Sequence, residues 1–172
     1  MRSRIAFTLS VIVCLGAAFG DAYPAEAATI TASVNASASK PLVLSKLQDL
    51  DLGTVMLGPG VWSNATVTLS QLGVRVCSPL NITCSGAAQV AQYNVQGSNQ
   101  QIVRISVPDV VMTNQSDGSK TLILTTDKPL AVILTNSGAP GTDFSIGGSV
   151  MVDSTTATGT YVGTFNVTAD YQ

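Results

Sequence analysis

Apolar and polar residues alternate in short stretches along most of this chain, as they do in β-strands with one buried and one exposed face. The clearest stretch closes the chain, from Tyr161 to Tyr171. One parity there holds aromatic residues, Val, Ala and Gly, while the other holds mostly Thr, Asn and Asp. This pattern predicts one long closing strand with a buried face and a solvent-exposed face, running to the carboxyl end of the chain.

A second regular stretch lies near the front, from Thr29 to Ser39. Its odd-numbered positions hold only Ser, Thr and Asn, so the stretch predicts a first strand. Pro41 ends this strand, because proline cannot donate to a β-ladder. The apolar parity of the stretch consists of Ile30, Ala32, Val34, Ala36 and Ala38.

Between these two stretches the pattern predicts further short strands separated by turn residues. The apolar parity slips around residues 45–48, which predicts a bulge or a short turn. The strands at 91–95 and 103–107 are expected to form a hairpin across a Gly-containing loop. No apolar spacing typical of a helix is sustained, so roughly eight or nine strands in an antiparallel β-sandwich are expected. The other strands are expected at 42–52, 65–76, 122–124, 130–134 and 144–152.

The first residues are typical of a secretory leader. Arg2 and Arg4 precede an apolar run over residues 5–19, and Ala25 and Ala27 form an Ala-x-Ala site. The run is too short for a membrane span, so we expect cleavage after Ala27 and no membrane insertion afterwards. Residues 1–27 are therefore expected to be a signal peptide, and residues 28–172 one domain exported to the periplasm, cell surface or medium.

The charge pattern excludes one class of partner. The chain has eight basic and ten acidic residues, and two of each lie in the expected leader. So sparse and balanced a set of charges offers no basic surface for nucleic acid.

Two cysteines, Cys77 and Cys84, remain outside the expected leader. An even pair in an exported chain predicts a disulfide. It would close a short loop, contribute about 2–3 kcal/mol and pin the tip of a hairpin. A metal site is the weaker interpretation, because the chain has no His and two thiolates do not complete a zinc shell.

Reactive side chains are scarce. The chain has no His, and its only Glu lies in the expected leader. Asp49 and Asp51 share a parity, but they lack the dense run of oxygen ligands that calcium needs. Five further Asp residues fall at predicted turns, where Asp commonly caps: Asp109, Asp117, Asp127, Asp143 and Asp153. We therefore expect no enzyme, no catalytic residue, no metal and no cofactor.

Two non-catalytic functions remain open. Trp62 follows a Gly-Pro-Gly turn and could stack on a sugar, as in a carbohydrate-binding adhesin module, although a Trp in such a place more often folds over the core. Terminal strands commonly lie at sheet edges, where unpaired backbone can add a strand from another chain. The alternative is a self-contained molecule in which the first strand pairs within its own domain.

Three stretches resemble a family of small exported bacterial proteins of unknown function, which is similar in layout to spore-coat-U-like and archaic chaperone–usher pilin subunits. They are Gln48 to Val55, Phe144 to Val150, and the closing Gly159 to Tyr171 with its Gly-Thr-Tyr opening. The resemblance covers essentially the whole of residues 28–172.

The resemblance implies an immunoglobulin-like sandwich that serves as a subunit of a fibre (fimbria or pilus) or coat. In such subunits a periplasmic chaperone pairs with the last strand, and a neighbour's first segment later completes the sandwich by β-augmentation. Phe165, Val167, Ala169 and Tyr171 would then face the core beside the acceptor groove. The inserted side chains would be Ile30, Ala32, Val34 and Ala36.

Overall fold

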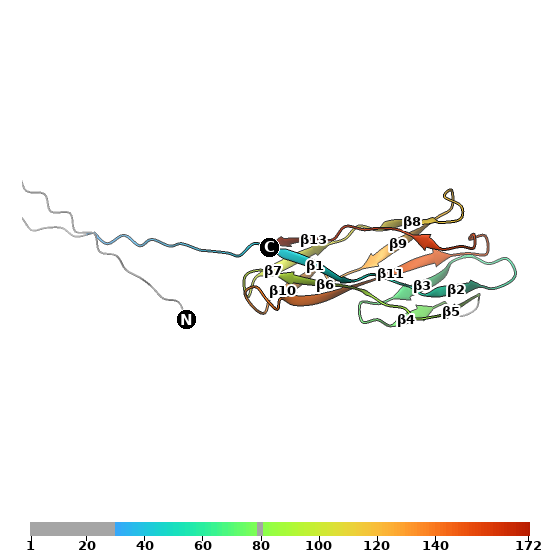
Figure 1. The fold of residues 1–172 in the computed structure, drawn as a ribbon, viewed down its shortest axis with the longest axis horizontal. Coiled ribbons are helices and arrows are strands. Elements are labelled where there is room, and N and C mark those ends of the chain that lie inside the picture. The colour runs from blue at the N-terminus through green and yellow to red at the C-terminus, as the bar shows by residue number, and fades with distance from the viewer. Residues whose placement is uncertain (1–29, 79–80) are drawn as a thin grey trace, which may run out of the picture. The chain divides into compact units, whose positions relative to one another are not determined.

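A computed structural model describes residues 30–78 and 81–172 (Figure 1). The expected signal peptide, residues 1–27, lies outside the described residues. The chain divides into two compact units, of which the second spans Ser39–Gln172. All of the regular structure in the described residues is β, and none of them forms a helix that could cross a membrane.

The second unit contains thirteen strands within the described residues. They are β1 (Val43–Gln48), β2 (Thr54–Leu57), β3 (Ala65–Leu69), β4 (Arg75–Cys77), β5 (Ile82–Ser85), β6 (Ala91–Gln96), β7 (Ile102–Ser106), β8 (Val110–Asn114), β9 (Thr121–Asp127), β10 (Ala131–Ile133), β11 (Thr142–Val152), β12 (Tyr161–Val162) and β13 (Thr168–Tyr171).

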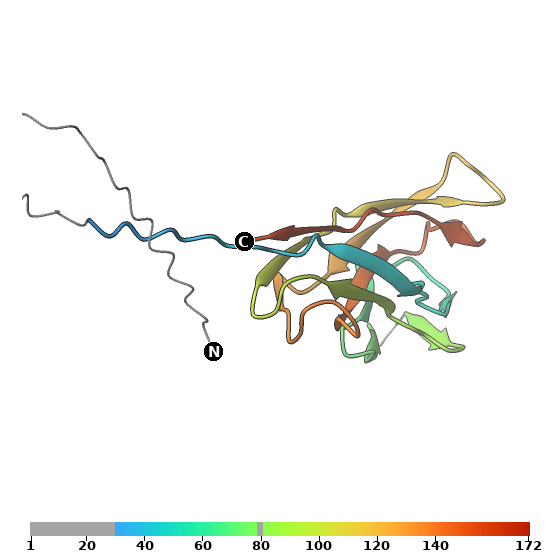
Figure 2. The same ribbon diagram turned by 60° about the vertical axis from the view of Figure 1, so that its left-hand side comes forward.

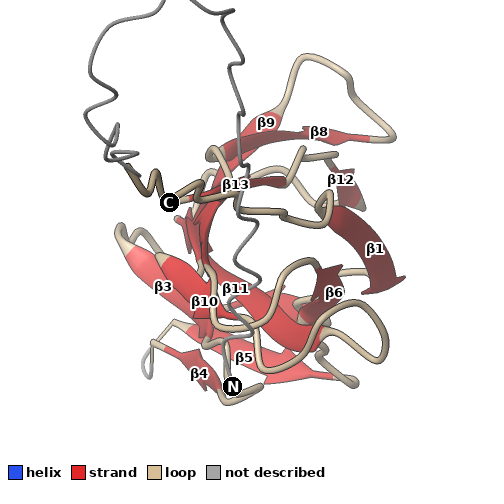
Figure 3. Ribbon diagram, turned by 90° about the vertical axis from the view of Figure 1, so that its left-hand side faces the viewer, coloured by secondary structure: helices blue, strands red, loops and turns tan. Residues whose placement is uncertain are grey.

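These strands form three antiparallel sheets. The largest has the order β1-β6-β11-β9-β8-β12, with β3 paired to β11 and β4 paired to β3. The second has the order β10-β7-β13, and the third consists of β2 and β5. Seen along the second unit in Figure 3, the sheets curve around a common interior. The predicted class, an all-β antiparallel sandwich, is confirmed.

Strand β11 is the centre of this arrangement, because it changes partners along its length. Its first half pairs with β6 and its second half with β3 and β9. Gly147 lies at the change, where a side chain would overlap the carbonyl oxygen of Leu69. Only glycine allows the β3 backbone to approach this closely.

The core consists of two clusters. The first cluster contains Ala91, Tyr93, Val95, Val103, Ile105, Val107, Leu134, Phe144 and Ile146. The second cluster contains Ala65, Val67, Ile82, Val110, Leu124, Val150 and Val152. Leu50 and Phe165 pack against both clusters.

Several local predictions are confirmed. The parity slip near Ser45 is a register shift between Lys46 and Gln48. Alternation also located β3, β6, β7, β9, β10 and β11.

The predicted hairpin between 91–95 and 103–107 is wrong. Strand β6 pairs with β1 and β11, whereas β7 pairs with β10 and β13. Val95 and Val103 are both fully buried in the first cluster, so the two strands contribute to one core from different sheets. Alternation marks which side chains point inward, but it does not say whether two strands share an edge.

The single strand predicted over 65–76 is also wrong. The chain turns at Ser70, whose carbonyl accepts the Gly73 amide at 2.9 Å, and returns as β4 beside β3. The turn reverses the parity, and Val74 and Val76 are more than half exposed.

The predicted long closing strand is interrupted. Strand β12 pairs with β8, strand β13 pairs with β7, and residues 163–167 belong to no strand. Pro108 separates β7 from β8, and without an amide hydrogen it cannot continue the ladder. The inward parity nevertheless holds, because Phe165, Val167, Ala169 and Tyr171 all pack against the first cluster.

The predicted first strand does not form within the described part of the chain. Residues 30–38, which we call the arm, have no strand assignment and are exposed throughout. The side chains of Ile30 and Val34 are 93% and 91% exposed. A strand needs a partner, and the arm has the residue pattern of a strand but no ladder.

Candidate functional site

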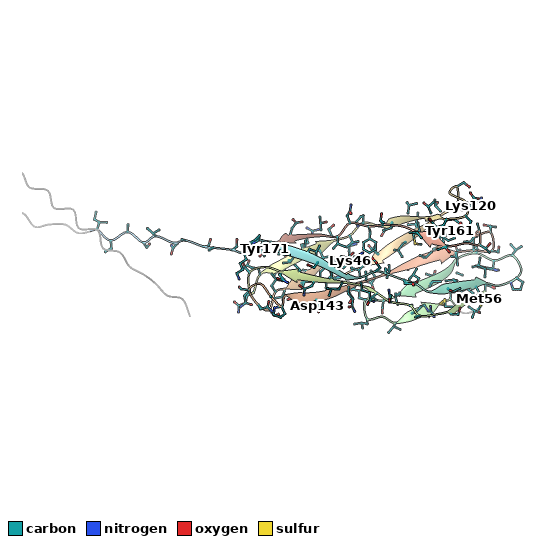
Figure 4. All side chains as sticks on the ribbon, viewed as in Figure 1. Lys46, Met56, Lys120, Asp143, Tyr161 and Tyr171 are labelled. Atoms are coloured by element: carbon teal, nitrogen blue, oxygen red, sulfur yellow. A yellow bond between two sulfur atoms is a disulfide. The ribbon has the colours of Figure 1, made fainter. Side chains whose placement is uncertain are left out.

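An apolar groove of about 1200 Å³ lies over the second cluster. Residues 49–57 form one side, the first wall, and residues 156–165 form the opposite side, the second wall. The floor includes Val67, Leu124 and Val150, which are buried members of the second cluster. Figure 4 shows Met56 and Tyr161, one from each wall, at the end of the second unit away from Tyr171.

The apolar residues that line the groove are only partly covered. Leu52 and Val55 on one side, and Met112, Leu122 and Phe165 on the other, pack against the second cluster but are half-buried. The corresponding side of the first cluster is closed by residues from both β1 and β13. The second cluster is therefore a half-core that lacks a covering layer.

Both walls also have free backbone along the groove. Strand β2 pairs only with β5, and β12 only with β8, among the described strands. Residues 163–165, at the end of the second wall, belong to no strand, and neither do residues 166 and 167 after it. Such edges carry donors and acceptors that an added strand can satisfy.

Arg75 holds the first wall in place. Its guanidinium donates to the carbonyl oxygens of Leu52 at 3.0 Å, Ser85 at 3.0 Å and Gly86 at 3.1 Å. The carboxylate of Asp51 accepts the amide of Gly53 at 2.7 Å. These contacts join the first wall to β4 and to the end of β5.

Asn114 holds the second wall. Its side chain is 1% exposed, and it donates to the carbonyl oxygen of Thr158 at 3.1 Å. Its side-chain oxygen accepts the amides of Ser116 at 2.8 Å and Asp117 at 3.2 Å. Gly159, with φ +143°, lies so close that a side chain would meet the Asn114 amide at 2.6 Å.

The turn before the second wall is capped by Asp153. Its carboxylate accepts the amide of Thr155 at 2.8 Å and the hydroxyls of Thr155 at 2.7 Å and Thr156 at 3.2 Å. These hydrogen bonds lower the pKa of Asp153 below its usual value, and those from Thr155 have the largest effect. In the turn between β8 and β9, hydrogen bonds from Ser119 lower the pKa of Asp117 in the same way. These two residues act as the turn caps predicted from sequence.

Three other Asp residues predicted to cap turns contact distant segments instead. Asp109 accepts the amide of Thr126 at 3.0 Å, Asp127 accepts the side chain of Gln71 at 2.8 Å, and Asp143 accepts that of Asn94 at 2.6 Å.

The disulfide between Cys77 and Cys84 is present, as predicted. It does not pin the tip of a hairpin, however, because β4 pairs with β3 and β5 pairs with β2. The bond links the largest sheet to the two-stranded sheet, whose strand β2 is part of the first wall, and both cysteines pack against the second cluster.

The four residues proposed on the closing strand do not all lie at the groove. Phe165 lines it, whereas Val167, Ala169 and Tyr171 lie beyond its end and pack against the first cluster. The proposed inserted residues, Ile30, Ala32, Val34 and Ala36, are all exposed in the arm.

Trp62 and the paired aspartates have local partners. The Trp62 indole donates to the carbonyl oxygen of Gly58 at 3.1 Å and packs against the second cluster, so it folds over the core. Asp49 pairs with Lys46 at 2.8 Å. The described residues contain no group of three or more His, Cys, Asp or Glu arranged to hold a metal ion.

Sequence reasoning missed Arg75 and Asn114 entirely. A lone Arg in an apolar stretch and an Asn before a turn are signals of side-chain contacts to the backbone, but neither identifies the partner carbonyl.

A model of one protein family, described as Domain of unknown function (DUF4402), matches residues 42–171. This chain is a DUF4402 protein. The match includes both walls of the groove and begins after the arm. For this DUF4402 domain, searches of curated proteins and of solved structures gave no significant match.

Proposed function

We propose that this protein is a non-enzymatic secreted subunit of a bacterial surface fibre or coat, which assembles by β-strand addition. The observation that carries the proposal is the open groove over the second cluster, with free backbone on both walls. A bound strand would satisfy that backbone and cover the half-core, completing an immunoglobulin-like sandwich.

The occupant of the groove is the arm of a second copy. The arm has nine residues, and the walls have nine and ten. Every second arm residue is apolar, so one face would meet the half-core while Ser, Thr and Asn face water. The inward residues would be Ile30, Ala32, Val34 and Ala36.

The arm of the same copy is too short for this groove. The domain begins at Ser39, and the groove begins at Asp49. An arm doubling back along residues 40–48 would use about 30 Å, at about 3.3 Å per residue, before reaching the groove. That distance is the whole length of nine extended residues, which favours the arm of another copy as the occupant.

Burial of the arm contributes to the driving force for strand addition. Covering Ile30 and Val34, which are almost fully exposed, contributes about 1.5–3 kcal/mol each. Each net backbone hydrogen bond along the walls adds about 0.5–1.5 kcal/mol. Because each copy donates one arm and accepts another at a different surface, the contacts do not close on themselves and chains of subunits result.

The resemblance adds a transient partner. A periplasmic chaperone could cover the same free edges before assembly, since it would recognise backbone and apolar pockets in the same way. The expected leader and the disulfide agree with export to an oxidising compartment.

The experiment compares self-association of residues 28–172 with that of Val34→Asp by sedimentation velocity over a range of concentrations. Val34→Asp places a charge on the inward face of the arm and is expected to stay monomeric. Ser33→Asp adds the same charge to the outward face and is expected to assemble like the parent. A parent protein that stays monomeric at high concentration, and whose groove binds no arm peptide, contradicts the proposal.

A carbohydrate-binding module is the other function that the sequence suggested. The Trp62 indole is occupied by the Gly58 carbonyl and by the second cluster, which gives this function no specific support.

A further inference from the structure

The groove has an exposed outer end and an inner end that borders the first cluster. At the inner end, Leu50 and Phe165, one from each wall, pack against both core clusters. Beyond them, Leu44 from β1 and Val167 from the closing segment pack together against the first cluster. The outer end lies at Met56 and Tyr161, and Met56 is 52% exposed (Figure 4).

The inner end borders a fully packed region. Val95 and Val103 at the centre of the first cluster have no exposed surface. At the far side of that cluster, the Tyr171 hydroxyl donates to the carbonyl oxygen of Lys40 at 2.6 Å. A strand lying in the groove therefore has no apolar channel to follow past Leu50 and Phe165.

We propose that Leu50 and Phe165 form a stop that fixes the direction and depth of the inserted strand, so that only an arm with a free amino end near Ile30 fits. This inference rests on the proposed function. It adds that removal of the preceding segment is a precondition for assembly.

The direction follows from the connection of the arm to its own domain. Residue 38 of a donated arm continues directly into a compact unit that begins at Ser39. That unit cannot sit at the inner end, so the carboxyl end of the arm must leave at the outer end. The arm then runs antiparallel to the second wall and parallel to the first, with Ile30 nearest the stop.

The depth follows from the lengths. Nine arm residues fill walls of nine and ten residues, so Ile30 reaches the stop when residue 38 is at the outer end. Cleavage after Ala27 would leave two residues before Ile30, which is short enough to bend out over the stop. A longer preceding segment would have to leave the groove between the two walls. It would displace the amino end of the arm, and Ile30 would no longer be buried.

The test uses residues 28–172 carrying Ile30→Asp and Val34→Asp, so that the groove stays vacant in an otherwise complete chain. Three synthetic peptides are titrated by isothermal calorimetry. One has the sequence of residues 30–38, one carries an eight-residue Gly-Ser extension at its amino end, and one carries the same extension at its carboxyl end. The two extended peptides have equal length and composition.

We expect the carboxyl-extended peptide to bind within about twofold of the parent peptide. The amino-extended peptide is expected to bind at least about tenfold more weakly, because its extension meets the stop. Phe165→Ala in the acceptor removes most of the stop and should reduce the difference between the two extended peptides. Val111→Ala, on an exposed β8 position outside the groove, should leave the difference unchanged.

Equal binding of the two extended peptides, or weaker binding of the carboxyl-extended one, overturns the stop while leaving strand addition intact. Failure of all three peptides overturns the proposed function together with the stop. The comparison of the extended peptides is made on the unaltered groove, so it decides the question even if Phe165→Ala does not fold.

Discussion

The Tyr171 hydroxyl donates a hydrogen bond to the carbonyl oxygen of Lys40 at 2.6 Å and accepts one from the amide of Ser98 at 2.7 Å. A single side chain of β13 thus joins the point where the chain enters the domain to the loop after β6. Figure 2 shows the carboxyl end of β13 beside the start of β1. This contact closes the domain at the end opposite the groove opening.

Tyr171→Phe removes both of these hydrogen bonds and keeps the ring. We expect a loss of about 1–3 kcal/mol in the free energy of unfolding, measured by urea denaturation. The affinity for the arm peptide should change by less than about twofold, because the contact lies outside the groove. Tyr161→Phe, which loses a 2.8 Å bond to the Ala157 carbonyl in the second wall, should instead weaken peptide binding. Equal effects of the two variants on peptide binding would contradict this division.

Arg75→Met removes the cation that binds three carbonyl groups behind the first wall. Leu52 is half-buried, whereas Ser85 and Gly86 are exposed and water can replace their lost hydrogen bonds. We therefore expect the free energy of unfolding to fall by about 1–3 kcal/mol in total, and peptide affinity to fall with it. Arg104→Met is the matched control. Arg104 is exposed on β7, which belongs to the β10-β7-β13 sheet, and it does not line the groove. The account is contradicted if the two variants bind the arm peptide equally well.

Reduction of the disulfide should loosen one part of the molecule before the rest. The bond ties the β2–β5 sheet to β4, and a two-stranded sheet alone is only marginally stable. Hydrogen exchange of a Cys77→Ser, Cys84→Ser double variant should increase in β2 and β5, with β6 and β7 still protected. The expected loss of global stability is about 2–3 kcal/mol. Uniform loss of protection over all strands would show that the bond supports the whole fold.

Acid should weaken the second wall through Asp153. Because the folded state lowers the pKa of Asp153, its contribution to stability is fully present above the unfolded pKa of 3.8 and is lost as the pH falls through the lower folded value. Denaturation at a series of pH values should therefore show a steeper decline below pH 3.8 for the parent than for Asp153→Asn. Asp170→Asn, at an exposed position on β13, serves as the control. Parallel pH profiles of the parent and Asp153→Asn would contradict the assignment.

Alternation in the sequence predicted the fold class and most inward-facing residues, because burial on one face of a strand imposes a period of two. It could not distinguish Val95 and Val103 in different sheets from the same residues in one hairpin, since both arrangements bury both side chains. It also could not show that Val34 is exposed and that the arm around it has no strand assignment in the described residues.

The candidate site was less predictable than the fold. Phe165 was identified from its parity, but the groove depends on where the first wall and the second wall separate. That separation is set by Arg75 and Asn114, whose partners are backbone carbonyls distant in sequence. Composition and spacing do not identify the partners of such contacts.

The most direct test replaces Val34 with a photo-crosslinking amino acid in an unlabelled chain and mixes it with isotope-labelled parent protein before irradiation. Strand addition between copies predicts crosslinks from position 34 of the unlabelled chain to residues 49–57 and 156–165 of the isotope-labelled chain. The same amino acid at Ser33, on the outward face of the arm, should give few of them. Crosslinks from position 34 that occur only within one chain, or that avoid both walls of the groove, would contradict the account.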